Sequence, residues 1–330
     1  MRKALRVLGW IATVLAVLLL GGLVYLGLAY PKRQAPPEVR IEPAPELLER
    51  GRYLFHNVAA CVVCHTPHEP SISGARIEPD RIGEGGPPFP LGSAGTLYAK
   101  NITPAALGEW TDGEIVRALR DGVSRDGSPL FPLMPYFNYR GLSERDLHAL
   151  VGYMRSLEPR ASEVPERELR FPMKLIIRMM PSPAGLYPAA PDPNGSVEYG
   201  RYLVSAASCG DCHSPMDRGQ PLPGRELSGG NPFPTGDGWV AYTANITPDS
   251  ATGIGRWTRE DFVGRFKSTQ AYATAIKARG PDEPHTPMPW PYYATMTEQD
   301  LGAVYDYLRS LTPVEHRVVP FERTKEGAAQ

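Results

Sequence analysis

Apolar and polar positions divide the chain into one long uncharged stretch and two tracts of amphipathic helix. From Val7 to Tyr30 there is no charged residue, and a helix of roughly 24 residues at about 1.5 Å per residue spans a hydrocarbon layer of ~30 Å. Basic residues before this stretch favour a cytoplasmic N-terminus and an exported remainder: Arg2, Lys3 and Arg6. Residues 1–33 are predicted to form a membrane anchor. A cleaved signal peptide, with Gly27-Leu28-Ala29 at the cleavage site, is the alternative, although its apolar region usually has only about 7 to 15 residues.

Amphipathic helices are predicted near the end of each half of the remaining chain. Their apolar side chains recur at i, i+3 and i+4, a spacing suited to packing on a core: Leu147, Leu150, Val151, Met154 and Leu157, then Leu301, Val304, Tyr305, Leu308 and Leu311. Helix starts are marked by Thr111 with Glu114, Ser143 with Glu144 and Asp146, Thr258 with Asp261, and Thr297 with Asp300. The stretches between the helices are rich in Gly and Pro and are predicted to be ordered loops, since few strands are visible.

The two halves repeat the same motifs in the same order. Gly51-Arg52-Tyr53-Leu54 returns as Gly200-Arg201-Tyr202-Leu203, and Asn101-Ile102-Thr103-Pro104 returns as Asn245-Ile246-Thr247-Pro248. Further pairs are Gly85–Pro90 with Gly229–Pro234, Trp110-Thr111 with Trp257-Thr258, and Arg155-Ser156-Leu157 with Arg309-Ser310-Leu311. An internal repeat of this kind indicates duplicated units.

The length of 330 residues is sufficient for an anchor and two domains of ordinary size. The predicted boundaries are 1–33 for the anchor, 34–45 for a linker, 46–160 for domain 1, 161–192 for a Pro-rich linker, 193–315 for domain 2 and 316–330 for a tail. The formal net charge of -1 argues against a nucleic-acid partner.

All four cysteines lie in two copies of the pattern Cys-x-x-Cys-His. The copies are Cys61, Cys64 and His65, then Cys209, Cys212 and His213. Two thiols at this spacing form thioether bonds to the vinyl groups of one haem, and the adjacent histidine binds the iron. The sequence therefore predicts two covalent haem c groups.

Other uses of these cysteines fit the pattern less well. A zinc site made from two such pairs usually has about 15 to 20 residues between them, whereas the two motifs here stand far apart at Cys64 and Cys209. A thioredoxin-like redox pair or a structural disulfide does not require a histidine after both second cysteines.

The repeat also indicates the second axial ligand of each iron. Met134-Pro135-Tyr136 aligns with Met288-Pro289-Trp290, and both methionines lie in Pro-rich loops away from any apolar helical stripe. A thioether is a soft ligand that favours Fe(II). Met134 and Met288 are the predicted ligands, and His285 is the alternative in the second half. Met296 aligns with Leu142 and is predicted to be a core residue.

With these motifs the chain resembles the membrane-bound di- and tri-haem cytochromes c, which include the cytochrome subunits of bacterial alcohol, aldehyde and gluconate dehydrogenases. The resemblance covers about residues 46–315 and implies an all-α fold class, with two tandem class I cytochrome c domains after the anchor. It also implies that Cys61, Cys64, His65 and Met134 hold one haem and that the matching residues hold the other. Dehydrogenase subunits of this type usually carry three haems, whereas this chain has two motifs.

The predicted function is electron transfer rather than catalysis, by a protein of the bacterial inner membrane whose haem domains lie in the periplasm. Iron with two protein ligands has no free position for a substrate. Expected partners are a dehydrogenase, a quinol-oxidising complex or a terminal oxidase. A role as the electron-accepting subunit of a membrane-bound dehydrogenase is the first alternative. A di-haem peroxidase is a weaker one, because it needs one open iron.

Overall fold

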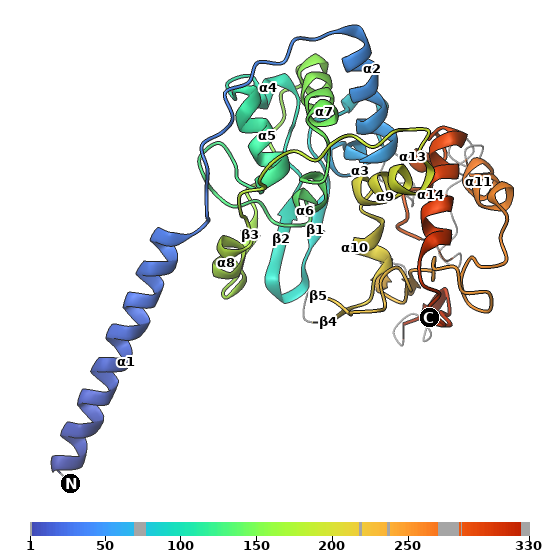
Figure 1. The fold of residues 1–330 in the computed structure, drawn as a ribbon. Coiled ribbons are helices and arrows are strands. Elements are labelled where there is room, and N and C mark those ends of the chain that lie inside the picture. Colours follow the sequence, from blue (N-terminus) through green and yellow to red (C-terminus); the bar gives the residue numbers. More distant parts are fainter. Residues whose placement is uncertain are drawn as a thin grey trace.

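The computed structural model describes residues 2–68, 77–217, 220–235, 238–269, 284 and 286–324. Helix α1 (Arg2–Ala29) projects away from a folded head that contains the rest of the described chain (Figure 1). None of its residues is buried, and it is long and apolar enough to cross a membrane. The predicted helix at the N-terminus is therefore present, with its apolar surface free to face lipid.

Each repeat is built around a pair of helices that cross closely. Helix α2 (Pro45–Tyr53) packs on α7 (Glu144–Ser156), and α9 (Ser196–Ala206) packs on α14 (Glu298–Ser310). Glycine is required at both crossings: a Cβ on Gly51 would lie 1.9 Å from the Ala149 carbonyl oxygen, and one on Gly200 would lie 1.9 Å from that of Ala303. The Gly-Arg-Tyr-Leu motif therefore begins with glycine because two backbones meet there.

Replacing Gly51 with alanine should destabilise the protein by about 1–3 kcal/mol, because the helices must separate to admit the methyl group. Denaturant unfolding followed by circular dichroism measures this change. Gly264→Ala is the matched control, since that glycine lies within helix α11 (Arg259–Lys267) and its added Cβ meets no atom within 4 Å. The control should be neutral or slightly stabilising, and an equal loss in both variants would contradict the crossing argument.

The four predicted helix starts are confirmed. Thr111 and Thr258 form capping boxes with Glu114 and Asp261, at the starts of α5 (Asp112–Asp121) and α11. The hydroxyls of Ser143 and Thr297 accept bonds from the backbone N–H groups of Asp146 and Asp300, at the starts of α7 and α14. These caps satisfy N–H groups that have no partner within the helix.

The described part of the chain forms three small antiparallel sheets beside the helices, so the predicted all-α class is not confirmed. The Pro-Phe-Pro part of each Gly-Gly repeat forms the outer strand of a three-stranded sheet. Strands of two to four residues show no alternation that a sequence pattern could reveal. The sheets are β1 (Pro88–Pro90), β2 (Gly95–Tyr98) and β3 (Glu168–Leu169), then β6 (Pro232–Pro234), β7 (Trp239–Tyr242) and β8 (Phe321–Arg323), and the pair β4 (Met216–Asp217) and β5 (Gln220–Pro221). Strands β3 and β8 come from the predicted linker and tail.

One inserted residue accounts for a local difference between the repeats. The first repeat has one more residue than the second between its Gly-Arg-Tyr-Leu motif and its first cysteine. At this place the chain forms a π-helical turn, η1 (Leu54–Val58), in which the Ala59 N–H bonds to the Leu54 carbonyl. A π-turn accommodates one additional residue without changing the helix on either side.

The two repeats contact each other through a reciprocal pair of tyrosines. The Tyr53 hydroxyl donates to Asp300 Oδ2 at 2.6 Å and accepts from the Thr297 N–H at 3.1 Å. In the opposite direction, the Tyr202 hydroxyl donates to Asp146 Oδ2 at 2.7 Å and accepts from the Ser143 N–H at 3.2 Å. Each Gly-Arg-Tyr-Leu tyrosine therefore binds the start of the other repeat's last helix, which gives the interface an approximate twofold symmetry.

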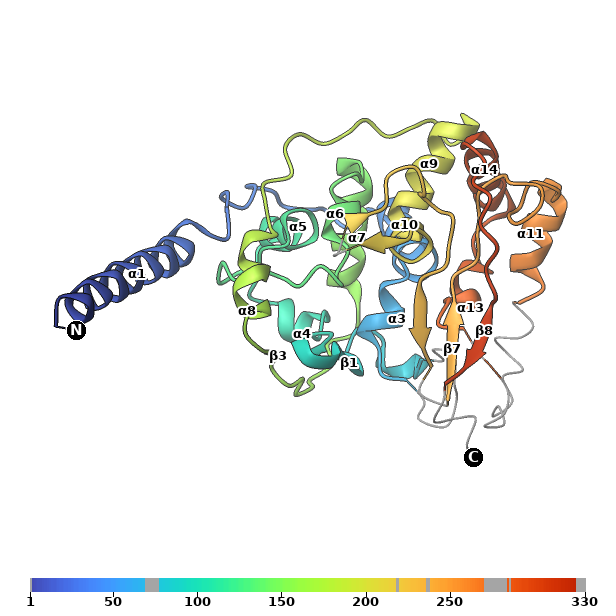
Figure 2. The same cartoon turned by 90° about the horizontal axis from the view of Figure 1, so that it is seen from below.

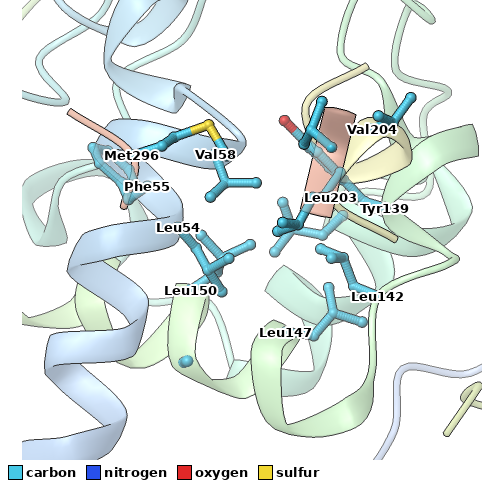
Figure 3. Packing of buried hydrophobic residues seen from close by; sticks show 14 of the residues in the cluster. Leu54, Phe55, Val58, Tyr139, Leu142, Leu147, Leu150, Leu203, Val204 and Met296 are labelled. Carbon is cyan, nitrogen blue, oxygen red and sulfur yellow. The ribbon is translucent and has the colours of Figure 1, made fainter. Parts of the chain in front are cut away.

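A single hydrophobic cluster continues across this interface. Figure 3 shows Leu54 and Leu150 of the first repeat together with Leu203 and Val204 of the second. Met296 is 3% exposed, which confirms the prediction that it is a core residue. Shared burial of this kind favours a fixed arrangement of the two repeats.

Shorter elements complete the described chain. They are α3 (Cys61–His65), η2 (Pro79–Arg81), η3 (Gly92–Ala94), α4 (Pro104–Leu107), α6 (Tyr136–Tyr139), α8 (Met173–Ile176), η4 (Ile177–Met179), α10 (Cys209–His213) and α13 (Trp290–Tyr293). The segment that joins the repeats runs along the first one, where Arg120 donates to the carbonyls of Gly185 and Leu186.

Candidate haem-binding sites

Both Cys-x-x-Cys-His motifs form one short helical turn, α3 in the first repeat and α10 in the second. The residue before each turn, Ala60 or Ser208, has a left-handed backbone conformation with φ of 47° or 56°. Such a conformation is uncommon for residues other than glycine, and it is maintained where the surrounding structure requires a sharp change of direction. The same turn therefore presents the motif in both repeats.

The cysteine thiols have pKa values above their ordinary range. Burial raises the pKa of Cys61 and of Cys209 to about 12, and burial raises that of Cys64 and of Cys212 to about 11. No disulfide joins any of the four. Reactive and metal-binding cysteines act as thiolates in surroundings that lower the pKa, so these sites suit uncharged sulfur, as in a thioether, better than a redox-active pair.

The two motif histidines are held with the same ring nitrogen free. His65 Nδ1 lies 2.7 Å from the Lys100 carbonyl oxygen, and His213 Nδ1 lies 2.8 Å from that of Ala244. A carbonyl can only accept, so Nδ1 must carry the proton and Nε2 keeps its lone pair. Burial lowers the pKa of both rings, so both stay neutral. A neutral imidazole oriented through Nδ1 is the form that ligates a metal through Nε2.

The Asn-Ile-Thr-Pro loops position those two carbonyls. Asn101 follows Lys100, and its Oδ1 accepts from the backbone N–H and the hydroxyl of Thr103, both at 2.8 Å. Asn245 follows Ala244 and accepts the same two bonds from Thr247, at 3.0 and 2.8 Å. The sequence repeat marked these loops, but their role in orienting the histidines was not predicted because it depends on a backbone carbonyl.

Met134 and Met288 both directly precede the proline before a short helix, α6 or α13. Both are half-buried. Met134 packs against the hydrophobic cluster that Cys61 and Val63 also contact. Met288 has its backbone N–H bonded to the Thr286 hydroxyl at 3.2 Å. Their role as iron ligands stays a prediction, and the alternative ligand His285 lies outside the described residues.

The remaining described histidines make contacts that stabilise the fold. His56 bonds to the Tyr153 hydroxyl at 2.8 Å, and burial lowers its pKa to about 4. His68 bonds to the Val63 carbonyl, and His316 to that of Ser228. His148 of α7 is half-buried, with its ring edge-on to Tyr187 of the connector.

The donor set fits covalent haem better than a metal ion held by the protein alone. Among the residues that the structure describes, no three His, Cys, Asp or Glu side chains converge as ligands of one ion. A structural zinc site needs four such ligands in a tetrahedron. Each motif instead offers two protonated thiols and one oriented imidazole, the groups that haem c uses.

Comparisons with known proteins agree with this chemistry. A family model described as Cytochrome c matches residues 197–312. The cytochrome c subunit of the quinone-dependent alcohol dehydrogenase of Gluconacetobacter polyoxogenes is 31% identical, over 81% of this chain and 56% of its own length. One subunit of the nicotinate dehydrogenase of Pseudomonas putida is 34% identical, over 80% of this chain and 21% of its own length. This chain thus spans about half, or less, of these two relatives.

A third relative has nearly the same extent as this chain. The diheme cytochrome c-type protein of Cereibacter sphaeroides is 32% identical over 71% of this chain and 78% of its own length. Similarity at this identity across most of both chains places the two proteins in the same family. The chain therefore belongs to the cytochrome c family, whose members transfer electrons through covalently bound haem.

Proposed function

We propose that the chain is a membrane-anchored, periplasmic electron carrier with two haem c groups, one in each of two class I cytochrome c domains. Cys61, Cys64 and His65 would hold the first group, with Met134 as a further iron ligand. Cys209, Cys212 and His213 would hold the second, with Met288. The observation that carries the proposal is the matched pair of histidines, each with Nδ1 bonded to a backbone carbonyl and Nε2 free.

Haem c supplies one-electron oxidation and reduction when it is bound. Residues of the first repeat contact the second motif across the interface between the repeats. Asn138 of the first repeat donates to Ser208 Oγ at 3.0 Å and to Asp211 Oδ2 at 2.9 Å, and Asp211 lies inside the second motif. This arrangement supports electron transfer within one chain, without a step in which separate carriers meet.

Two tyrosines, one buried and one half-buried, occupy matching positions beside the two motifs. The Tyr139 hydroxyl donates to the Ala59 carbonyl at 3.4 Å, and the Tyr293 hydroxyl donates to the Ala207 carbonyl at 2.9 Å. Both carbonyls lie just before the residue that turns the chain into the motif. Burial raises the pKa of both phenols well above the ordinary value, so both tyrosines stay uncharged at the interface.

The partner is proposed to be a dehydrogenase, from which the chain accepts electrons. The names of the relatives support this: one belongs to an alcohol dehydrogenase and another to a nicotinate dehydrogenase. Since those enzymes act on different substrates, the substrate belongs to the partner and the cytochrome part carries electrons. Helix α1 supports attachment to the inner membrane. A terminal oxidase would then receive the electrons.

Counting haem per chain tests the proposal. The full chain, matured with the c-type attachment system, should contain two covalent haems by the pyridine haemochromogen assay and intact mass. The double variant Cys61→Ala, Cys64→Ala should retain one covalent haem per chain. The double variant Cys209→Ala, Cys212→Ala should also retain one. One haem in the unchanged protein would contradict the proposal. Strong carbon monoxide binding by the unchanged, reduced protein would instead favour an open iron, as in a peroxidase.

Co-purification identifies the partner. The protein is extracted from its own membranes in mild detergent, and the proteins that accompany it in equal amount are identified by mass spectrometry. A dehydrogenase subunit is the expected result. If an oxidase or a quinol-oxidising complex co-purifies and no dehydrogenase does, the dehydrogenase assignment is contradicted. The assignment of electron transfer would still hold.

A further inference from the structure

A short helical segment of the connector touches the end of the membrane helix. This segment, residues 171–180, contains α8 and η4 and lies on the side of the head from which α1 departs, as both views show (Figures 1 and 2). Within it, Arg178 Nη2 donates to the carbonyl oxygens of Gly27 at 2.9 Å and Tyr30 at 2.6 Å. The connector is therefore attached to the end of α1.

These bonds place residues 171–180 at the same depth in the membrane as the end of α1. The last carbonyls of a helix have no partner within it, and a basic side chain often satisfies them. Arg178 does so at the end of α1. The end of a membrane-spanning helix lies at the boundary between hydrocarbon and headgroups, where aromatic residues such as Tyr30 are common. Residues 171–180 consequently lie at the same boundary.

The segment exposes apolar side chains that the head does not cover. Phe171 is 80% exposed and Met179 is 45% exposed, whereas Ile177 between them is only 2% exposed. One part of the segment thus holds it to the protein while another part is free. Short helical segments with apolar side chains free on one side and basic residues nearby are typical of the membrane interface.

Within the two stretches of chain that meet here, every charged side chain is basic, which matches an anionic lipid surface. Five basic residues lie in the two stretches that meet here: Lys32, Arg33, Arg170, Lys174 and Arg178. No acidic residue occurs in residues 27–37 or 169–187. Basic clusters beside a membrane helix are attracted to anionic headgroups.

We propose that residues 171–180 form a second membrane contact, with Phe171 and Met179 among the lipid headgroups and Lys174 against lipid phosphates. The inference rests on the proposed membrane anchor and goes beyond it. A single helix would tether the head loosely, whereas two contacts hold it in one orientation. The two repeats then keep one orientation relative to the membrane plane.

Spin labelling of the full, haem-loaded chain tests this contact. All four native cysteines are in the haem motifs, so one introduced cysteine can carry the only nitroxide. The variants are Phe171→Cys for the segment, Val24→Cys within α1 and Leu186→Cys as a matched connector control that is 95% exposed. Each variant is placed, with its haems oxidised and the nitroxide intact, in nanodiscs with phosphatidylglycerol and phosphatidylcholine. Relaxation by oxygen and by a water-soluble nickel chelate measures the depth of the label.

The label at Phe171 should collide several-fold more with oxygen than with the chelate, approaching the label at Val24, while the label at Leu186 should show the reverse. Adding Lys174→Glu should move the Phe171 label toward water in these nanodiscs. A Val24 label in lipid with a Phe171 label in water would overturn this inference and leave the anchor in place. A label at Val24 that is exposed to water would overturn both the membrane anchor and the second membrane contact. Shielding of Phe171 from oxygen and chelate alike would indicate a protein partner and overturn the lipid contact.

Discussion

Replacing Met134 or Met288 with alanine is expected to lower the reduction potential of one haem by on the order of 100 mV and to open its iron to carbon monoxide. The thioether is a soft ligand that favours Fe(II), so its loss stabilises the oxidised state. Each methionine directly precedes Pro135 or Pro289, in matching loops before α6 and α13. Each change should therefore affect one haem and leave the other unchanged.

A redox titration followed by absorbance, with a carbon monoxide difference spectrum, measures both effects. Met296→Leu is the control, because that methionine is 3% exposed in the hydrophobic cluster and an apolar replacement of similar volume costs little. Its potentials and spectrum should match those of the unchanged protein. Should Met134→Ala and Met288→Ala both behave like this control, the axial ligands are other residues, with His285 the next to examine in the second repeat.

Replacing Asp146 with alanine is expected to destabilise the protein by about 3–5 kcal/mol, because it leaves a half-buried arginine without its partner. Asp146 is 6% exposed. It accepts bonds from Arg50 Nε at 2.9 Å, from Arg50 Nη2 at 2.7 Å and from the Tyr202 hydroxyl at 2.7 Å. One carboxylate therefore joins the first and last helices of its own repeat to the opposite repeat.

Denaturant unfolding of the haem-loaded protein measures this loss. Asp300 occupies the matching position and accepts from the Tyr53 hydroxyl at 2.6 Å, so Asp300→Ala should cost less, about 1–3 kcal/mol. Glu198→Ala is the control, since it removes a solvent-exposed ion pair with Arg201 and should cost less than about 1 kcal/mol. A loss at Asp146 no larger than at Glu198 would show that the carboxylate does not hold the repeats together.

The haem motifs and the helix starts could be predicted from the sequence because each depends on residues that are close along the chain. Cys61, Cys64 and His65 form one helical turn, and Thr111 caps a helix through Glu114 three residues later. The short sheets were missed because their strands contain two to four residues, too few to show alternation. The first sheet also pairs Gly95 with Leu169, far away in the sequence.

Residue patterns along the chain are enough to predict the haem chemistry: two Cys-x-x-Cys-His motifs, one in each repeat, with an uncharged helix before them. The three-dimensional fold determines which nitrogen of His65 and His213 is free, because the Lys100 and Ala244 carbonyls that bind the rings belong to distant loops. It also decided that Tyr53 and Tyr202 bind across the interface and that Arg178 contacts the end of α1. Such contacts depend on how separate helices pack in space, and local residue patterns contain no information about that packing.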